Sequence, residues 1–343
     1  MKFLTRGLFL LMCVALLNTM SVQRGDAASR TKVRFTLDWA PGSYHAPFFI
    51  ALYKGYYADE GLDVTIDRGK GSAEVVRQLA SGVYDFGHPD MNVLIDFISR
   101  HPEIRMPMLL VNYEQYPSGI FALKKSNIGK PTDLEGRALG AAANDSTFKL
   151  WPVFAEQAGV DAAKVKTTFF DPSLREALLI KGNVDAITGQ IFRSILDLKA
   201  RGAREDDIVK FMYKDFGLDL YGNGVVASPS FLKDHPEAVR GFIRATIRGF
   251  KDMAGDRDMA TDMLLRYEPL LNHDVERERL DVALACCILT ENVRKQGYGS
   301  VNPERLARAI TQIYQIYNLP RAPSPEEIFD GSYLPSSEER QIN

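Results

Sequence analysis

The stretch that decides the fold is Leu37–Asp63, which reads LDWAPGSYHAPFFIALYKGYYADEGLD. Apolar and polar residues alternate over positions 33–38, and this alternation predicts a half-buried β-strand. Pro41 and Gly42 end that strand. A helix then begins near Tyr44, with Ser43 as its N-cap, and carries bulky apolar side chains along one side. The stretch is therefore predicted to be a strand, a turn and a helix in direct succession.

Three side chains with useful chemistry lie at this turn: a carboxylate, an indole and an imidazole, from Asp38, Trp39 and His45. Because they follow a strand, they lie at its C-terminal end, which is where open α/β sheets bind ligands. Trp39 offers a flat apolar face for stacking on a planar ring, or else packs under a loop. His45 either contacts a ligand or is simply packed. We expect this stretch to form one wall of a small-molecule pocket.

Strands and helices alternate along the chain on both sides of an interruption at 113–119 (YEQYPSG). Such alternation predicts an α/β fold with mostly parallel sheets. We interpret 113–119 as a crossing into a second lobe and 221–224 as the return. The prediction is two α/β lobes joined by a two-segment hinge: 29–118 and 224–318 form lobe I, 119–223 form lobe II, and 319–343 form a mobile C-terminal tail. A ligand cleft is expected between the lobes.

The composition is that of an ordinary soluble globular protein, with 343 residues, 45% hydrophobic and 25% charged, and a formal net charge of −2. Nucleic-acid binding usually needs a basic patch or a high pI, and this near-neutral balance provides neither. No interior apolar run reaches the length of a membrane span. Composition therefore argues against a nucleic-acid partner.

The N-terminus has the pattern of a secretory signal peptide over residues 1–28. Lys2 and Arg6 precede a ten-residue apolar block, Leu8–Leu17, and small residues end the segment at Ala27 and Ala28. The alternative, a membrane anchor, is disfavoured because the apolar block is too short to span a bilayer. We therefore expect a cleaved signal peptide and a mature chain in the periplasm.

The sequence lacks the motifs of common catalytic and metal sites. There is no G-x-S-x-G, H-E-x-x-H, C-x-x-C or phosphate-binding loop, and the five histidines form no pair at ligand spacing. Cys286 and Cys287 are adjacent in an apolar helical stretch, where they are expected to be small buried side chains rather than a disulfide. We predict a binding protein and not an enzyme, with no metal and no cofactor.

Polar and aromatic residues at other predicted strand ends and crossings extend the candidate site. Asp90, Asp145 and Asp171 each follow a strand, where they either edge the cleft together with Asp38 or cap helices. A cleft edged by acids disfavours an anion and suits a neutral or cationic ligand rich in N–H donors. Gln190 can pair with an amide or pyrimidine edge. Three tyrosines at the crossings are either aromatic walls or hinge packing (Tyr113, Tyr116 and Tyr221).

Several segments together resemble a known family. They are Asp38-Trp39 with Pro41 and His45, the run 54–64 (KGYYADEGLDV), and the later segments 79–87, 133–137 and 182–186. In this order they are similar to the solute-binding proteins of ABC importers for thiamine pyrimidine precursors, alkanesulfonates and nitrate, and nearest to the pyrimidine-precursor branch. The resemblance implies a type II periplasmic-binding-protein fold. It also implies a planar heterocycle held by Trp39, His45 and tyrosines from both lobes.

The expected function is therefore a monomeric periplasmic binding protein that delivers a thiamine pyrimidine precursor, hydroxymethyl- or formylaminopyrimidine, to an ABC permease and ATPase complex in the inner membrane. Closure of the hinge would trap the ligand, with Trp39 and a tyrosine around its ring and the 144–147 helix start on the far side. The alternatives within the family are riboflavin or another aromatic, a sulfonate such as taurine, and nitrate. A sulfonate site should bring an arginine or a free helix N-terminus to the cleft. The candidate ligand-binding residues are Asp38, Trp39, His45, Asp90, Tyr113, Tyr116, Asn144, Ser146, Thr147, Asp171, Gln190 and Tyr221.

A more distant alternative is a pyrimidine synthase of thiamine biosynthesis, a relative that consumes its own histidine. Those synthases carry a clustered cysteine motif, and Cys286-Cys287 matches it in neither position nor number. The signal peptide also argues against a synthase. The activity is therefore not carried over to this chain.

Overall fold

The computed structural model describes residues 30–342. All the elements discussed below belong to one continuous unit of the chain that begins at Thr31. The predicted signal peptide, with Cys13, lies outside the described residues. Within residues 30–342, no helix combines the length and the apolar character needed to cross a membrane.

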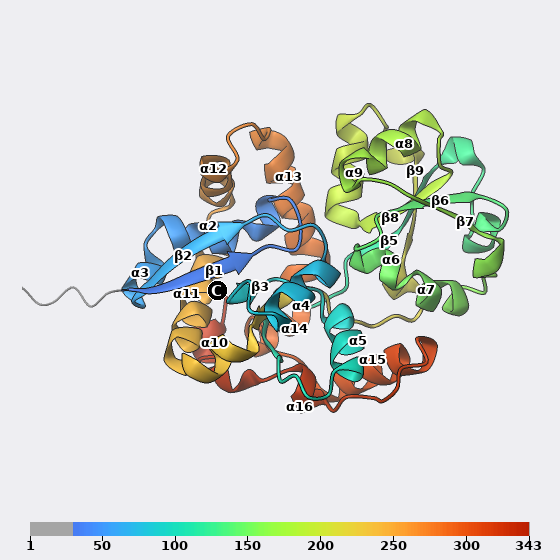
Figure 1. Ribbon diagram of the computed structural model, residues 1–343. Helices are drawn as coiled ribbons and strands as arrows, with labels where there is room; N and C mark the ends of the chain where they lie inside the picture. Colours follow the sequence, from blue (N-terminus) through green and yellow to red (C-terminus); the bar gives the residue numbers. More distant parts are fainter. Residues whose placement is uncertain (1–29, 343) are drawn as a thin grey trace, which may run out of the picture. The chain divides into compact units, whose positions relative to one another are not determined.

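Two five-stranded sheets organise the chain (Figure 1). The first has the order β2-β1-β3-β10-β4, and its strands are β1 (Thr31–Thr36), β2 (Leu62–Asp67), β3 (Phe86–Gly87), β4 (Met108–Val111) and β10 (Gly224–Ala227). The second has the order β7-β6-β8-β5-β9, and its strands are β5 (Ser118–Leu123), β6 (Ala138–Ala141), β7 (Lys166–Phe169), β8 (Ala186–Gln190) and β9 (Ile208–Met212). The predicted α/β class is confirmed.

The two sheets share one topology, because β6 to β9 take the places that β1 to β4 take in the first sheet. In each sheet the fourth strand in order is antiparallel to both its neighbours: β10 in the first and β5 in the second. The remaining pairs are parallel. The sheets are therefore mixed, whereas mostly parallel sheets were predicted. The two antiparallel strands, β5 and β10, adjoin the segments that connect the two sheets.

Helices cover both sheets. Around the first sheet lie α2 (Ala46–Tyr53), α3 (Tyr56–Asp59), α4 (Ser72–Ala80), α5 (Met91–Arg100), α10 (Pro229–Asp234), α11 (Pro236–Gly255), α12 (Arg257–Tyr267) and α13 (His273–Ala283). The second sheet carries α6 (Ser146–Lys149), α7 (Trp151–Gln157), α8 (Arg175–Lys181) and α9 (Ile191–Ala200). Three further helices follow in the chain: α14 (Glu291–Gln296), α15 (Pro303–Ile316) and α16 (Pro325–Ile328).

Burial of large aromatic side chains fixes the first sheet beneath its helices. Phe35 of β1 lies edge-on to Phe48 of α2 and Phe242 of α11, and Phe242 also stacks on Phe86 of β3. All four rings are fully buried, and each contributes on the order of 2–3 kcal/mol of hydrophobic free energy. The predicted alternation of β1 thus delivers Phe35 to the core and leaves Asp38 beyond the strand end.

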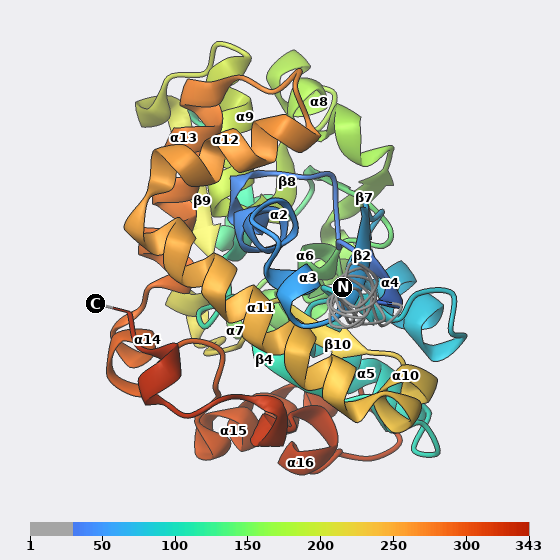
Figure 2. The same cartoon turned by 90° about the vertical axis from the view of Figure 1, so that its left-hand side faces the viewer.

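Helices α9 and α13 run alongside each other, and this contact joins the two sheets (Figures 1 and 2). Arg279 of α13 donates to the carbonyl oxygen of Phe192 and to the carboxylate of Asp197, both on α9. Its pKa is raised because Asp197 and Glu276 outweigh the effect of burial, so it stays charged. Helix α15 makes a second contact of this kind, because it packs against both α5 of the first sheet and α7 of the second.

Three sequence expectations differ from the structure. The helical periodicity of 275–295 predicts one helix, but a π-helical turn, Leu284–Ile288, containing Cys286 and Cys287, separates α13 from α14. Helix α2 begins at Ala46, because Ser43–His45 forms a 3-10 turn and Ser43 is not its N-cap. The C-terminal segment is packed, since Ile328 is fully buried and Arg340 donates to the carbonyl oxygen of Tyr298.

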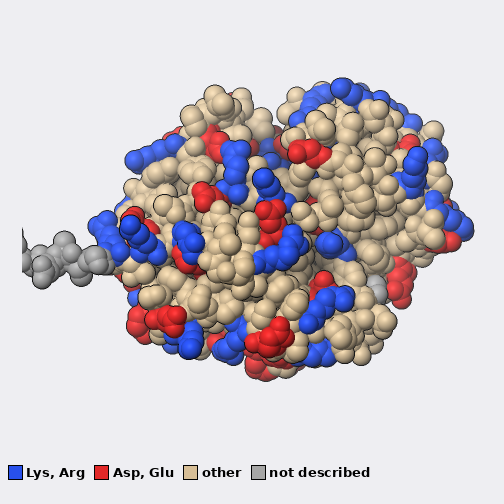
Figure 3. Space-filling model, in the orientation of Figure 1, with Lys and Arg blue, Asp and Glu red and all other residues tan. Residues whose placement is uncertain are grey.

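Charges of both signs are interspersed over the face shown in Figure 3.

Candidate functional site

The C-terminal ends of parallel strands from both sheets meet around one cavity. Its lining comes from the loops after β1, β2 and β6, from the end of β8, and from α8 and α9. We call it the inner cavity, and it is lined by Asp38, Trp39, Gly71, Ser72, Asp145, Ser146, Arg175, Gln190 and Arg193. Because both sheets contribute, the inner cavity depends on how their strand-end loops meet.

Close backbone approaches shape the wall that belongs to the first sheet. The amide of Gly71 donates to the carbonyl oxygen of Asp38 at 2.7 Å, and that of Gly69 donates to Trp39 at 3.2 Å. A Cβ on Gly69 would lie 2.0 Å from the carbonyl oxygen of Leu37, so only glycine fits there. The two loops therefore hold Asp38 and Trp39 in a fixed position at the cavity edge.

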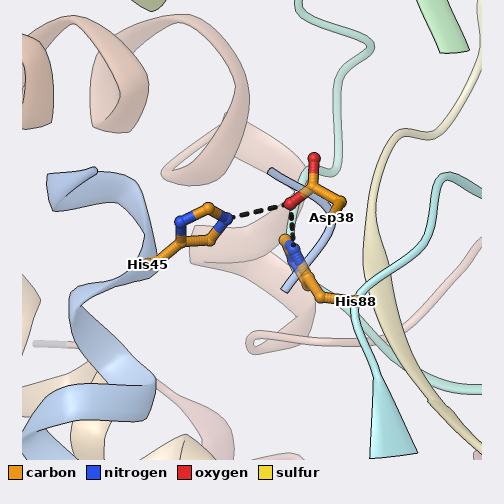
Figure 4. Close-up of side chains that lie close together, drawn as sticks. All are labelled: Asp38, His45 and His88. Atoms are coloured by element: carbon orange, nitrogen blue, oxygen red, sulfur yellow. Dashed lines mark hydrogen bonds and ion pairs between the residues drawn. The ribbon is translucent and has the colours of Figure 1, made fainter. Parts of the chain in front are cut away.

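Asp38 is held by two histidines (Figure 4). Its Oδ1 lies 2.9 Å from Nε2 of His45 and 3.1 Å from Nδ1 of His88, and both imidazoles are fully buried. The second oxygen, Oδ2, points away from both rings and makes no hydrogen bond to a described residue. Asp38 thus presents a free carboxylate oxygen from a cavity-lining residue.

The charge state of this cluster follows from its contacts. Burial disfavours ionisation of Asp38, but the hydrogen bonds from His45 and His88 outweigh it and hold its pKa well below the usual range. Burial lowers the pKa of His45 to about 4, against the opposing effect of Asp38, so His45 is neutral at pH 7. The cluster is therefore a carboxylate held by a neutral His45, with a net negative charge facing the cavity.

Asp38, His45 and His88 also lie close enough to be considered as metal ligands, since one donor atom from each falls within 4.8 Å of the others. The hydrogen bonds argue against that role. Asn112 Nδ2 lies 3.1 Å from His88 Nε2, while its Oδ1 accepts from the Tyr298 hydroxyl at 2.6 Å. His88 Nε2 is then an acceptor, which places the proton on Nδ1, facing Asp38. The nitrogen nearest Asp38 is occupied by that hydrogen bond.

Two arginines, Arg175 (buried) and Arg193 (half-buried), contribute positive charge that the sequence prediction did not include. Arg175 pairs with Asp145 at 3.1 Å and with Glu176 at 2.9 Å, and both carboxylates keep its pKa raised against burial. Its guanidinium lies 5.9 Å from the ring centroid of Trp39. Arg193 donates to the carbonyl oxygen of Ala40 and to the Tyr44 hydroxyl, and so connects α9 to the loop after β1. The predicted acidic edge therefore also carries two arginines, and Arg175 offsets part of the negative charge of Asp145 and Glu176.

A larger opening adjoins the inner cavity, with a volume of about 590 Å³. We call it the outer cleft. Trp39 and Arg193 line both spaces, and Asn144 and Asp171 line the outer cleft alone. Asp171 is exposed and caps a 3-10 turn by accepting from the Ser173 amide, so the capping alternative holds for it. Asp145 both caps α6 and lines the inner cavity.

Six of the predicted residues line the two spaces: Asp38 and Trp39 follow a strand of the first sheet, and Asn144, Ser146, Asp171 and Gln190 belong to the second. Asp90 is instead fully buried and caps α5 by accepting from the amides of Asn92 and Val93. Its Oδ2 has no partner among the described residues, and burial raises its pKa to about 7.

The predicted tyrosines are all buried, and none lines the inner cavity or the outer cleft. The hydroxyls of Tyr113 and Tyr116 have no hydrogen-bond partner among residues 30–342. The Tyr221 hydroxyl accepts from the Asn302 amide, and its ring lies under Arg305. Thr147 is buried and donates to Ser118. A tyrosine opposite Trp39 therefore remains a prediction, and the group that lies over the Trp39 ring is Arg175.

Sequence reasoning missed His88, Arg175 and Arg193. His88 follows β3 directly, so the same strand-end argument that selected Asp90 could have selected it. The two arginines lie within the predicted helices of the second lobe, on α8 and α9, where nothing in the local pattern distinguishes them from surface charges. Their burial depends on which helices face the other sheet.

Curated relatives align with most of the chain at low identity. The formylaminopyrimidine-binding protein of Halalkalibacterium halodurans is 27% identical over 286 residues, covering 81% of this chain and 82% of its own. The riboflavin-binding protein RibY of Chloroflexus aurantiacus is 24% identical over 272 residues, covering 76% and 72%. The 4-amino-5-hydroxymethyl-2-methylpyrimidine phosphate synthase of Legionella pneumophila is 24% identical over 243 residues, covering 71% and 75%.

Solved structures show the same fold. The periplasmic aliphatic sulphonate binding protein SsuA of Escherichia coli superposes with a TM-score of 0.68 at 15% identity, covering 90% of this chain and all of its own. This likeness confirms the type II periplasmic-binding-protein fold that the sequence resemblance implied. A family model described as NMT1/THI5 like matches residues 42–260, well over half of the sequence. The protein is therefore a member of the NMT1/THI5-like family.

Proposed function

We propose that the protein is a periplasmic binding protein of an ABC importer and that its ligand is a small planar N-heterocycle of the thiamine pyrimidine precursor type. The observation that carries the proposal is Asp38, a carboxylate fixed by His45 and His88 with one free oxygen beside the Trp39 indole. A carboxylate accepts N–H donors, and an indole face stacks on a planar ring. The ligand would carry both features.

The rest of the inner cavity supplies hydrogen-bond donors, in contrast to the acceptor oxygen of Asp38. Ser146 and Gln190 offer neutral donors and acceptors from the second sheet, and Arg193 offers guanidinium N–H groups. An aminopyrimidine presents an amino group to Asp38 and ring nitrogens to such donors. The formylaminopyrimidine-binding relative supports this class of ligand.

The arginines reopen the sulfonate alternative, because an arginine in the cleft is what a sulfonate site requires. The existing partners of Arg175 and the charge of Asp38 argue against it. Arg175 already has two carboxylate partners, Asp145 and Glu176, and the free oxygen of Asp38 would repel an anion in the same cavity. The inner cavity encloses only about 10 Å³, so a pyrimidine would have to widen it or extend into the outer cleft, and riboflavin, which the RibY relative is named for, is larger and would extend further into that cleft.

A panel titration tests the proposal. The mature protein is mixed with hydroxymethylpyrimidine, formylaminopyrimidine, riboflavin, taurine and nitrate, and thermal shift and isothermal titration calorimetry are recorded. A pyrimidine should give the largest shift. Trp39→Ala should abolish that shift, whereas Trp39→Phe, which keeps an aromatic face, should retain part of it. Binding of taurine or nitrate alone, or an unchanged affinity in Trp39→Ala, would exclude the proposed ligand site.

A synthase role is the second candidate, because several relatives, including the one from Legionella pneumophila, are named as pyrimidine phosphate synthases. The sequence argument against it is the missing cysteine cluster. Purified protein incubated with iron and pyridoxal phosphate should give no pyrimidine product. Product formation would make the protein an enzyme and replace the transport proposal.

A further inference from the structure

We propose a second small-molecule site, distinct from the inner cavity and the outer cleft, that takes a small aromatic carboxylate. It is a hollow of about 330 Å³, which we call the side hollow. Its lining includes Val76, Arg77, Phe97, Lys149, Leu150 and Tyr317. None of them lines the inner cavity or the outer cleft, and the inference does not rest on the proposed function.

The side hollow is built from three separate parts of the fold. Helices α4 and α5 form one wall, the end of α6 and the residue after it form another, and Tyr317, just after α15, closes the third side. Helix α5 packs against α4, α6 and α15, which fixes the walls relative to one another. The space is therefore a junction between packed helices rather than a dip in a loop.

Charge on the rim points to an anionic guest. Arg77 of α4 and Lys149 of α6 approach from opposite walls, both side chains are exposed, and neither forms an ion pair with any residue in 30–342. Arg100 is the third cation, and its Nε lies 2.8 Å from Asp96, the one carboxylate in the lining. Arg77 and Lys149 are thus two positive charges without an ion-pair partner among the described residues. A carboxylate bound between them would form charge-assisted hydrogen bonds.

The floor of the side hollow is apolar and in part aromatic. Val76, Val93 and Leu150 contribute aliphatic surface, and the ring of Phe97 packs on that of His101 at a centroid distance of 4.5 Å. A pocket of mostly apolar walls with a few converging polar groups is the usual design of a small-molecule site. An apolar ring under an anionic head therefore matches this space better than a small inorganic anion does.

Tyr317 adds a neutral donor to this side of the hollow. Burial raises the pKa of its hydroxyl, which keeps the phenol protonated, and the hydroxyl has no partner among the described residues. Asn92, whose side-chain amide donates to Asp90 and to the carbonyl oxygen of Tyr221, leaves its Oδ1 unpartnered in the same wall. The Tyr317 hydroxyl can donate to a carboxylate guest, whereas the Asn92 Oδ1 is itself an acceptor and needs a donor such as water.

Benzoate is the probe that tests the site, with benzamide as a neutral isostere and acetate as an anion without a ring. Saturation-transfer NMR and calorimetry on the mature protein should detect benzoate, while benzamide and acetate should bind at least about fivefold more weakly. Arg77→Gln and Lys149→Gln should each weaken benzoate at least about threefold, and the double variant should abolish it. Lys32→Gln, an exposed lysine on β1, serves as the charge-matched control and should leave the affinity unchanged.

The two sites can be told apart with the variants already named. Trp39→Ala should leave benzoate binding unchanged if benzoate occupies the side hollow. Loss of benzoate binding in Trp39→Ala would place it in the inner cavity and overturn the proposal. Equal binding of benzamide and benzoate, or equal effects of Lys149→Gln and Lys32→Gln, would also overturn it, because the two rim cations would then play no part.

Discussion

Asp38 combines two properties that rarely coincide: it is nearly buried, and it stays ionised. The hydrogen bonds from the two imidazoles to Oδ1 make this possible, and His45, whose pKa burial lowers to about 4, adds no positive charge at neutral pH. Oδ2 is therefore left as a strong acceptor at the edge of the inner cavity. A ligand N–H that meets it gains a charge-assisted hydrogen bond in a place from which water is largely excluded.

Asp38→Asn should accordingly cost more in binding than in folding. An asparagine Oδ1 can still accept from both histidines, but its amide group would meet the ligand as a donor. We expect at least about a tenfold loss of affinity for the pyrimidine that binds best, from the difference between charged and neutral hydrogen bonds. Calorimetry measures it. Asp161→Asn, at an exposed cap far from the cavity lining, is the charge-matched control and should bind normally. Equal affinities in the two variants would remove Asp38 from the site.

Asp90 makes stability depend on pH in a direction opposite to most carboxylates. Burial raises its pKa from 3.8 to about 7, so the folded state holds its proton where the unfolded state has lost it. Its contribution to stability therefore falls as pH rises from about 4 to about 7, and stays low above that. Asp90→Asn removes the penalty, and it should gain roughly 2–3 kcal/mol relative to the native protein between pH 5 and pH 8.

Thermal melting at pH 5 and pH 8 checks this shift, and Asp171→Asn provides the matched control. Asp171 also caps a turn, but it is exposed, and the hydrogen bonds from Ser173 lower its pKa. Its contribution is already complete above pH 4, so Asp171→Asn should show the same small loss at both pH values. A loss in Asp90→Asn at pH 8 would mean that Asp90 is stabilised as an anion.

The site residues differ in how far the sequence could reveal them. Asp38 and Trp39 stand beside a strand with a clear alternation, so their place at a strand end followed from local pattern alone. Arg175 is buried and Arg193 is half-buried because α8 and α9 face the loops of the other sheet. That depends on contacts between residues more than 100 positions apart, such as Arg193 with Ala40, which no local pattern contains.

Elements with a strong period were predicted well, and short or interrupted ones were not. The helical spacing of apolar residues predicts helices over 191–200 and 257–267, and α9 and α12 have these ranges. The sequence also predicts a short strand over 82–87, but β3 has only two residues, since it pairs with β1 and β10 only at the end of that stretch. The π turn at Leu284–Ile288 leaves the apolar pattern of 275–295 unbroken, so the sequence shows no signal for it.

At the same scale, the loops after β2 and β6 meet so closely that a side chain is excluded. A Cβ on Gly71 would lie 2.5 Å from the carbonyl oxygen of Asn144, on the other side of the site. Gly71→Ala should therefore hold the two loops apart and weaken pyrimidine binding at least about tenfold, which calorimetry can measure. Gly71 also has a φ of +122°, so alanine will cost on the order of 1 kcal/mol of stability by strain alone.

The control variant Gly136→Ala distinguishes the effect of backbone strain from the effect of a close contact between two loops. Gly136 has a φ of +81°, and a Cβ there would meet no atom within 4 Å. It should lose a similar amount of stability in thermal melting and bind the ligand normally. If both variants lose affinity alike, strain rather than the meeting of the two loops would be the cause.

For the whole molecule, the shared topology of the two sheets brings corresponding strand ends to one place. Asp38 follows β1 and Asp145 follows β6, which are equivalent strands in the two sheets. The sequence showed this repetition as two strand-helix series divided at 113–119, and that is why the fold class could be predicted. It did not show that each sheet contains an antiparallel strand, because direction is set by the partners of β5 and β10 and not by their composition.

A ligand that contacts the strand ends of both sheets can bring the two sheets closer together. It does so only if it binds the closed arrangement more tightly than the open one. Asp38 and Trp39 line the inner cavity from one side and Gln190 and Arg193 from the other, so a ligand bound between them should be accompanied by closure. Small-angle X-ray scattering should show a smaller radius of gyration when the best pyrimidine saturates the mature protein. Asp38→Asn at the same ligand concentration should stay nearer the ligand-free value, because less of it is bound. A saturated native protein with an unchanged radius of gyration would show that the site binds without closure.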